Sequence, residues 1–390
     1  MSVDAGSAEG LVARTAALVP MLRASAADTE KARRVGPATL DALSEAGVFK
    51  MLAPKRYGGD EADFQTQCLV LATIALGCPS TSWVATIYSA MAWVAGVFPD
   101  QAQEEVFANR DPRISGVFAP TGTAMPADSG WIVSGTWGFN TGCHGSEWTV
   151  LNAVVSTSDG DAVPTCVLVR SRELTILDDW YASGMAGTGS NTIVADHVFV
   201  PAHRALSLPN MIAAHYPARH NSDNPYFNYP LTPVLVVNAG GTPIGIARGA
   251  FETFMERLPG RGITFTTYTN KAEAPITHLQ VGEAALKIDS ADAHVRRATA
   301  LLDTNSAVPM TMEARVESRV HIAYATGLAR EAVDILFLAS GASSIQAHVP
   351  IQRFQRDIQA LANHAIMHAP TAIELYGRVL CGLGPNTLLY

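Results

Sequence analysis

Cysteine is scarce and scattered in this chain of 390 residues. The cysteines are odd in number and include no CxxC pair (Cys68, Cys78, Cys143, Cys166 and Cys381). Such a set argues against a disulfide framework and favours reduced thiols, so we expect a cytoplasmic location. The first residues, MSVDAGSAEG, also lack the basic and apolar regions of a secretion signal.

Excess positive charge and long apolar runs are missing as well. Lys and Arg total 27 against 35 Asp and Glu, which gives a net charge of −8 at pH 7. A chain of this charge is not attracted to nucleic acid or to an anionic membrane, so we expect neither as a partner. No segment reaches the roughly 20 uncharged apolar residues that span a bilayer. The His, Cys and carboxylate residues show no metal-ligand spacing, so we expect no metal site.

Three kinds of sequence pattern follow one another along the chain. Residues 1–111 carry apolar residues at helical spacing, including the almost wholly apolar stretch Trp83 to Phe98, and predict an α-helical domain. Residues 112–229 consist of short β-branched and aromatic runs between Gly, Asp and Ser turns, and predict an antiparallel, barrel-like β-domain with a long connecting loop. Residues 230–390 contain long amphipathic stretches, the last from Val349 to Cys381, and predict a four-helix bundle.

Four motifs carry a resemblance to a known family. They are PKRYGG from Pro54, TWGFNTGCHGSEW from Thr136, GMAGTGSNTIVADHVFVPAHR from Gly184 and QRFQRD from Gln352. In this order they resemble the acyl-CoA dehydrogenase fold, which implies an α+β, mostly α architecture with the three domains given above. The Phe-x-Thr-Gly turn followed by His and Trp, and the Gly-Thr-Gly-Ser sequence, are similar to one branch of that fold, the two-component flavin-dependent monooxygenases of the group D type.

The carboxylate base of a dehydrogenase is absent from both places where the family carries it. In many members a Glu stands two residues before a Pro and ahead of an Arg-Asp pair. Here the Pro is Pro350, the pair is Arg356-Asp357, and the base position holds His348. The alternative place, at the start of the first bundle helix, reads TPVLVVNAGG and contains no acid. Because dehydrogenation needs a group that removes the α-proton, the sequence favours oxygenation.

The resemblance implies how such an enzyme works. An oxygenase component takes reduced flavin from a separate NAD(P)H:flavin reductase and reacts it with O2 through a C4a-hydroperoxide, which survives only where water is excluded. We therefore expect reduced FMN as the cofactor, with FAD as the alternative, a homotetramer, and hydroxylation of a small aromatic or polycyclic substrate. An acyl-CoA dehydrogenase with an atypical base, an N-oxygenase of an amine, and a non-catalytic family member remain the alternatives.

The same resemblance nominates the catalytic residues. Thr141 would stand near flavin N5. His364 follows the Arg-Asp pair by seven residues, and His368 would follow one helical turn later on the same face. A histidine of near-neutral pKa can take a proton from a phenol or an amine. Both histidines could instead be buried or capping residues of their helix.

The remaining candidates bind the flavin or the substrate. For the flavin they are Phe139, Asn140 and Thr141 in the turn, Thr121 beside the ring, Thr188 and Ser190 in the GTGS sequence, and Arg261 and Gln280, which would reach the phosphates of a flavin in a neighbouring subunit. For the substrate they are Trp83, Tyr88, His144 and His348. Trp83 could equally be a core residue, His144 a surface turn residue, and the aromatic-rich segment from Leu206 to Pro230 either a lid or a connection that its aromatic side chains pin down.

Overall fold

The computed structural model describes residues 8–156, 162–303 and 309–390. Its first part is helical and consists of α1 (Ala8–Ala32), α2 (Pro37–Ala46), α3 (Phe64–Gly77), α4 (Pro79–Ala95) and α5 (Asp100–Val106). Helix α2 starts with Pro37 and ends at Gly47, which adopts the left-handed conformation. Helix α4 is buried along nearly its whole length, as its apolar sequence predicts.

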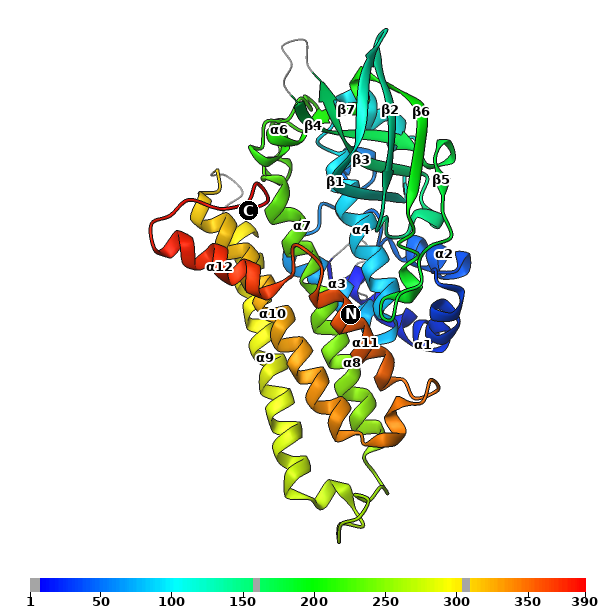
Figure 1. Cartoon of the computed structure of the whole chain (residues 1–390), viewed down its shortest axis with the longest axis vertical. Helices are drawn as coiled ribbons and strands as arrows, with labels where there is room; N and C mark the ends of the chain where they lie inside the picture. Colours follow the sequence, from blue (N-terminus) through cyan, green and yellow to red (C-terminus); the bar gives the residue numbers. More distant parts are fainter. Residues whose placement is uncertain (1–7, 157–161, 304–308) are drawn as a thin grey trace.

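A twisted sheet lies at one end of the molecule (Figure 1). Its strands are β1 (Ile114–Ala127), β2 (Gly130–Trp137), β3 (Trp148–Ser156), β4 (Ala162–Arg170), β5 (Thr175–Ile176), β6 (Ile193–Pro201) and β7 (Ala205–Ser207), in the order β5-β6-β2-β1-β3-β4-β7. The expectation of a purely antiparallel domain is wrong at one place, since β1 pairs with β3 in parallel. The reason is that β2 pairs with one side of β1, and the turn after β2 carries the chain across to the other side.

The C-terminal part is a helical bundle (Figure 1). It contains α7 (Leu231–Ala239), α8 (Gly241–Arg257), α9 (Pro275–Asp303), α10 (Met312–Ala339), α11 (Ile351–Ala362) and α12 (Ala369–Leu380), and the short α6 (Leu208–Ile212) precedes it. A helical domain, a central sheet and a C-terminal bundle confirm the expected α+β fold class. The single last helix expected from Val349 to Cys381 is wrong, because α11 ends at Ala362 and α12 starts at Ala369 in a new direction. Pro370 stands in the first turn of α12, where a missing N–H is tolerated.

Helices α7 and α8 are largely buried in the core of the fold. By length and composition alone the stretch Leu231–Arg257 could cross a membrane, but 83% of its most apolar window is buried inside the fold. Close approach to α3 requires glycine: a Cβ on Gly241 would lie 2.2 Å from the Cys68 carbonyl oxygen, and one on Gly245 would lie 2.1 Å from that of Ala72. The apolar character of this stretch therefore reflects its place in the core.

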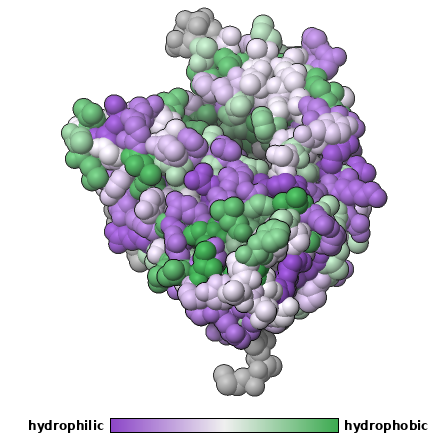
Figure 2. All heavy atoms as spheres, turned by 60° about the horizontal axis from the view of Figure 1, so that its bottom comes forward, coloured by the Kyte–Doolittle hydropathy of each residue, from purple (hydrophilic) through white to green (hydrophobic). Residues whose placement is uncertain are grey.

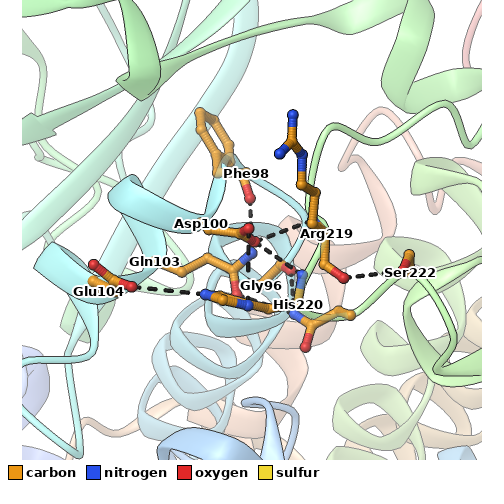
Figure 3. A network of polar contacts seen from close by, with 9 residues as sticks. Gly96, Phe98, Asp100, Gln103, Glu104, Arg219, His220 and Ser222 are labelled. Carbon is orange, nitrogen blue, oxygen red and sulfur yellow. Dashed lines mark hydrogen bonds and ion pairs between the residues drawn. The ribbon is translucent and has the colours of Figure 1, made fainter.

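The aromatic-rich connection between the sheet and the bundle is anchored by hydrogen bonds. The Asp100 carboxylate accepts from the backbone N–H groups of Arg219 and His220, each at 3.0 Å (Figure 3). The buried Asn221 side chain donates to the Gln103 side chain at 3.0 Å. The polar residues of this segment thus tie it to the N-terminal helices, which favours the second of the two expectations, a pinned connection.

Candidate active site

Two segments far apart in the sequence meet at the end of the sheet. One is the turn after β2, residues 138–143, and the other is the segment before β6, residues 184–191. The Gly142 N–H donates to the Thr188 carbonyl at 3.0 Å, and the Asn140 N–H donates to the Asn191 carbonyl at 3.2 Å. The two motifs with the strongest resemblance to flavin monooxygenases therefore form one continuous surface.

A chain of hydroxyl groups runs through this surface. The Thr141 Oγ1 lies 2.8 Å from the Ser190 Oγ, which lies 2.6 Å from the Thr188 Oγ1. The Thr188 hydroxyl donates to the Met185 carbonyl at 2.8 Å. All three hydroxyl residues are buried. All three are predicted flavin-binding residues, and the structure joins their hydroxyls in one hydrogen-bonded chain.

The other predicted residues of the turn differ in exposure. Phe139 adopts the left-handed conformation (φ +62°), is 77% exposed and meets Trp180 edge to face with the ring centroids 5.8 Å apart. Asn140 is fully buried, and neither its amide nitrogen nor its amide oxygen has a hydrogen-bond partner among the described residues. Thr121 is exposed on β1 and donates to the Thr136 carbonyl at 2.7 Å.

Helix α11 holds the second segment in place. The Asp357 carboxylate accepts from the Met185 N–H at 2.6 Å, and the Arg356 guanidinium donates to the Ser183 carbonyl at 2.7 Å. A Cβ on Gly184 would lie 2.0 Å from the Arg356 carbonyl oxygen, so only glycine permits this approach. The sequence analysis used the Arg-Asp pair only as a register mark and missed this function. The signal that could have found it is an acidic residue buried among apolar neighbours, since a buried carboxylate must have partners.

Glu30 forms ion pairs with two arginines of α11, next to the contacts between α11 and the segment before β6. Glu30 of α1 bonds Arg353 at 2.9 Å and Arg356 at 2.5 Å. Burial alone would raise the pKa of Glu30, but the hydrogen bonds from the two arginines outweigh it and hold the pKa below its ordinary value. Burial raises the pKa of Asp357 to about 7, against the lowering effect of the Met185 N–H. The segment before β6 is thus fixed to α1 and α11 by a partly buried ionic network.

His364 lies just beyond α11 and faces an aromatic ring of α4. Its imidazole meets Trp83 edge to face, with the ring centroids 5.1 Å apart. Although the side chain is accessible to solvent in the isolated chain, protein atoms surround it on most sides, and this burial lowers its pKa to about 4. His364 is therefore neutral at pH 7 and can accept a hydrogen bond or a proton.

Helix α4 connects the histidine to the turn. Five residues after Trp83, the Tyr88 hydroxyl donates to the Gly142 carbonyl at 2.5 Å. Burial raises the pKa of Tyr88, so its hydroxyl remains a donor. Tyr88 is fully buried, and it lines a small pocket beside the turn together with Gly142, His144 and Thr188. His144 similarly bonds the Asn191 side chain at 3.0 Å, which ties the turn to the segment before β6.

His368 is not on the same face as His364, and that expectation is wrong. It is the residue preceding α12, and its Nδ1 lies 3.4 Å from the Thr371 hydroxyl. Its side chain lines a separate pocket together with Tyr324 of α10 and Met367. The helix break described above separates the two histidines.

The last three predicted residues lie at the other end of the bundle. His348 is exposed and precedes α11, whose 12 residues span about 18 Å. Arg261 donates to the Ser343 hydroxyl at 2.8 Å in the loops that close that end, and Gln280 stands in the first turns of α9. Within one chain, none of the three comes together with Thr141 or His364.

The residues that do come together suit a flavin ring. Phe139 presents an exposed aromatic surface, and Thr141 presents a hydroxyl. Asn140 has a buried amide without a hydrogen-bond partner among the described residues. A buried polar group without a partner is costly, and a polar heterocycle with several donors and acceptors would relieve that cost. When bound, reduced flavin supplies the electrons that activate O2, chemistry that no protein side chain performs.

Comparison with known proteins agrees with this arrangement. The model of the acyl-CoA dehydrogenase N-terminal domain matches residues 15–108, and that of the acyl-CoA dehydrogenase C-terminal domain matches residues 238–369. The chain belongs to the acyl-CoA dehydrogenase family.

Its relatives define the branch. The oxygenase component of the FADH2-dependent resorcinol hydroxylase of Rhizobium sp. is 32% identical over 388 residues, which cover 96% of this chain and 95% of that protein. The oxygenase subunit HsaA, a flavin-dependent monooxygenase of Rhodococcus jostii, is 35% identical over 377 residues, 95% of this chain and 98% of that protein. The solved structure of XiaF from Streptomyces sp. in complex with FADH2 and glycerol superposes with a TM-score of 0.92 at 32% identity and covers 97% of both chains.

Within the family, the chain is the oxygenase component of a two-component flavin-dependent monooxygenase. It uses reduced flavin, which a separate flavin reductase supplies. The predictions of family, enzyme class and cofactor are confirmed.

Proposed function

We propose that the substrate is a small aromatic compound with an ionisable hydroxyl group, which the enzyme hydroxylates on the ring. The single observation that supports this most is the pairing of Trp83 with a neutral His364. The indole, which is buried except for 5% of its surface, gives the site an apolar wall, and the imidazole packed against it supplies a proton acceptor. The names of the relatives agree, since they include a resorcinol hydroxylase and, at 25% identity, a p-hydroxyphenylacetate 3-hydroxylase.

In this proposal His364 accepts the proton of the substrate hydroxyl. Loss of that proton raises the electron density of the ring, which makes the carbon next to the hydroxyl a better nucleophile. Burial lowers the pKa of His364 to about 4, so the imidazole is neutral and can accept a hydrogen bond throughout the neutral range, although it is a weaker base than an ordinary histidine. Trp83 packs edge to face against the imidazole and orients it for this transfer.

In this proposal the turn after β2 holds the flavin ring through Thr141, Asn140 and Phe139. Tyr88 and His144 keep their turn in position through Gly142 and Asn191. We propose FMN and FAD as alternative cofactors, with the relatives' FADH2 as the stronger precedent. The electrons come from NAD(P)H through the reductase.

The test uses the purified protein with chemically reduced FMN or FAD and a panel of phenols and aromatic amines under ¹⁸O2. We expect a phenol to be hydroxylated with one ¹⁸O atom in the product. His364→Gln should lower kcat at least tenfold while leaving flavin affinity unchanged, since one general base contributes about 100-fold or more. Labelled product from an amine but from no phenol would overturn the proposed substrate class.

We further propose a cytoplasmic homotetramer. All five cysteines are free, and four of them are buried. Apolar side chains gather on the face of Figure 2, which brings the lower end of the bundle forward, and the large exposed apolar residues of α9, α10 and the segment after α10 are Ile276, Leu279, Leu286, Leu338 and Ile345. Such a surface favours burial between subunits, where a neighbouring chain's flavin could meet Arg261 and Gln280. Light scattering of the purified protein decides, and a monomer would refute the assembly.

A further inference from the structure

The hydroxyl chain behind the turn has a fixed direction. The Met185 carbonyl can only accept, so the Thr188 hydroxyl must donate its single hydrogen to it. The contact of 2.6 Å between Thr188 and Ser190 requires a hydrogen between the two oxygens, and that hydrogen must come from Ser190. Ser190 then has no hydrogen left for Thr141. The contact of 2.8 Å between Thr141 and Ser190 is therefore a bond that Thr141 donates.

This direction leaves Thr141 with one possible role toward a ligand. Its hydrogen is committed to Ser190, and no described group donates to its oxygen. Toward the flavin side, the Thr141 hydroxyl can only accept. A hydroxyl without such neighbours would rotate and could donate or accept as its ligand required.

We infer that Ser190 and Thr188 are positioning residues that select the oxidation state of the flavin through Thr141. Reduced flavin carries a hydrogen on N5 and donates it, whereas oxidised flavin has a bare N5 that accepts. An acceptor-only Thr141 pairs with the reduced form and opposes the oxidised one. The inference rests on the proposed contact between Thr141 and the flavin ring.

The Met185 carbonyl, at which the chain of hydroxyl groups ends, is held by several hydrogen bonds. The Met185 carbonyl also receives the Thr188 N–H at 3.1 Å and the Trp180 indole N–H at 3.2 Å. The Met185 N–H donates to Asp357, and Met185 itself adopts the left-handed conformation (φ +53°) that a side chain rarely takes. The carbonyl cannot turn away without breaking these bonds together. Through its hydrogen bond to Met185, Asp357 of α11 therefore helps to fix the direction in which the Thr141 hydroxyl donates.

The experiment measures the dissociation constants of reduced and oxidised FMN, under anaerobic conditions, for the full-length protein. Ser190→Ala removes the acceptor of the Thr141 hydrogen. Thr188→Val removes the acceptor of the Ser190 hydrogen, so that Ser190 turns toward Thr141. In both variants Thr141 can donate to oxidised flavin, and we expect the preference for the reduced form to fall about tenfold, which corresponds to one hydrogen bond.

Two further variants separate this effect from a general loss of packing. Thr188→Ser keeps the chain and should keep the preference. Thr326→Val removes a buried threonine hydroxyl that donates to the Ile322 carbonyl in α10, and it should change neither dissociation constant. Thermal unfolding of each variant checks that the fold is retained.

Thr141→Val distinguishes the two ways in which the inference can fail. If it changes flavin binding while Ser190→Ala and Thr188→Val leave the preference as in the wild type, the direction of the chain is irrelevant and this inference is wrong. If Thr141→Val leaves both dissociation constants unchanged, Thr141 does not contact the flavin, and the proposed contact falls together with the inference.

Discussion

The lowered pKa of His364 makes the stability of the protein depend on pH in a way that one substitution removes. Burial lowers this pKa from an ordinary value near 6.5 to about 4. Between these two pH values the unfolded chain binds a proton that the native protein does not bind. The contribution of His364 to the free energy of unfolding therefore falls as the pH drops through 6.5 and levels off below 4.

The size of the effect at pH 5 follows from the two pKa values. Taken in full, the shift would cost the native state about 2 kcal/mol relative to neutral pH. Because the ring of His364 is accessible to solvent, we discount this figure for screening to about 1 kcal/mol. His364→Gln keeps a polar side chain of comparable size and removes the titration.

The assay is urea unfolding at pH 7.5 and pH 5, followed by tryptophan fluorescence. From the higher to the lower pH, the wild type should lose about 1 kcal/mol more than His364→Gln. Asn363→Ala, a neighbouring change that does not titrate, should behave as the wild type. Equal pH dependence in the wild type and His364→Gln would refute the burial of a neutral imidazole, and with it the proposed base.

Three further predictions concern the supports of the flavin turn. Tyr88→Phe removes the donor to Gly142 and should weaken flavin binding about fivefold without unfolding the protein, as titration of both proteins with reduced FMN can show. Asp357→Ala should lower the free energy of unfolding by about 2 kcal/mol because a buried loop N–H loses its acceptor. Since the pKa of Asp357 is raised to about 7, its own contribution to stability should decline as the pH rises from about 4 to 7, opposite in sign to that of His364. In urea unfolding, Asp357→Asn should therefore gain stability relative to the wild type as the pH rises through this range. Gly184→Ala places a Cβ 2.0 Å from a carbonyl oxygen of α11 and should abolish hydroxylation, whereas Gly282→Ala, with nothing within 4 Å, should leave turnover as it is.

The sequence predicted the parts of the site that depend on local patterns. Thr141, Thr188 and Ser190 stand in short motifs whose turns fix where their hydroxyls point, and the structure joins them in one chain. Trp83 and His364 are 281 positions apart, and only the order of motifs along the fold suggested that both belong to one site. The resemblance to the family nominated all five of these residues.

The parts that could not be predicted depend on long-range contacts. Asp357 and Met185 are separated by 172 positions, and their hydrogen bond needs a left-handed Met185, which no propensity predicts. The parallel pairing of β1 with β3 likewise depends on where the turn after β2 carries the chain. Periodicity describes which face of an element is apolar, but it does not reveal which carboxylate reaches which peptide group.

The break between α11 and α12 determines where the proposed catalytic histidine lies. Helical spacing of four residues would have put His364 and His368 on one face, and both would then have been equal candidates. The structure ends α11 at Ala362, so His364 projects from a turn toward Trp83 while His368 begins a helix that runs in another direction. Because an irregular turn can present a side chain at an angle that no helix face offers, His364 reaches the start of α4 from a helix whose own inward face is occupied by Asp357 and the bundle core. In the proposed mechanism, the position of the proton acceptor is therefore set by the end of α11 and the turn that follows it.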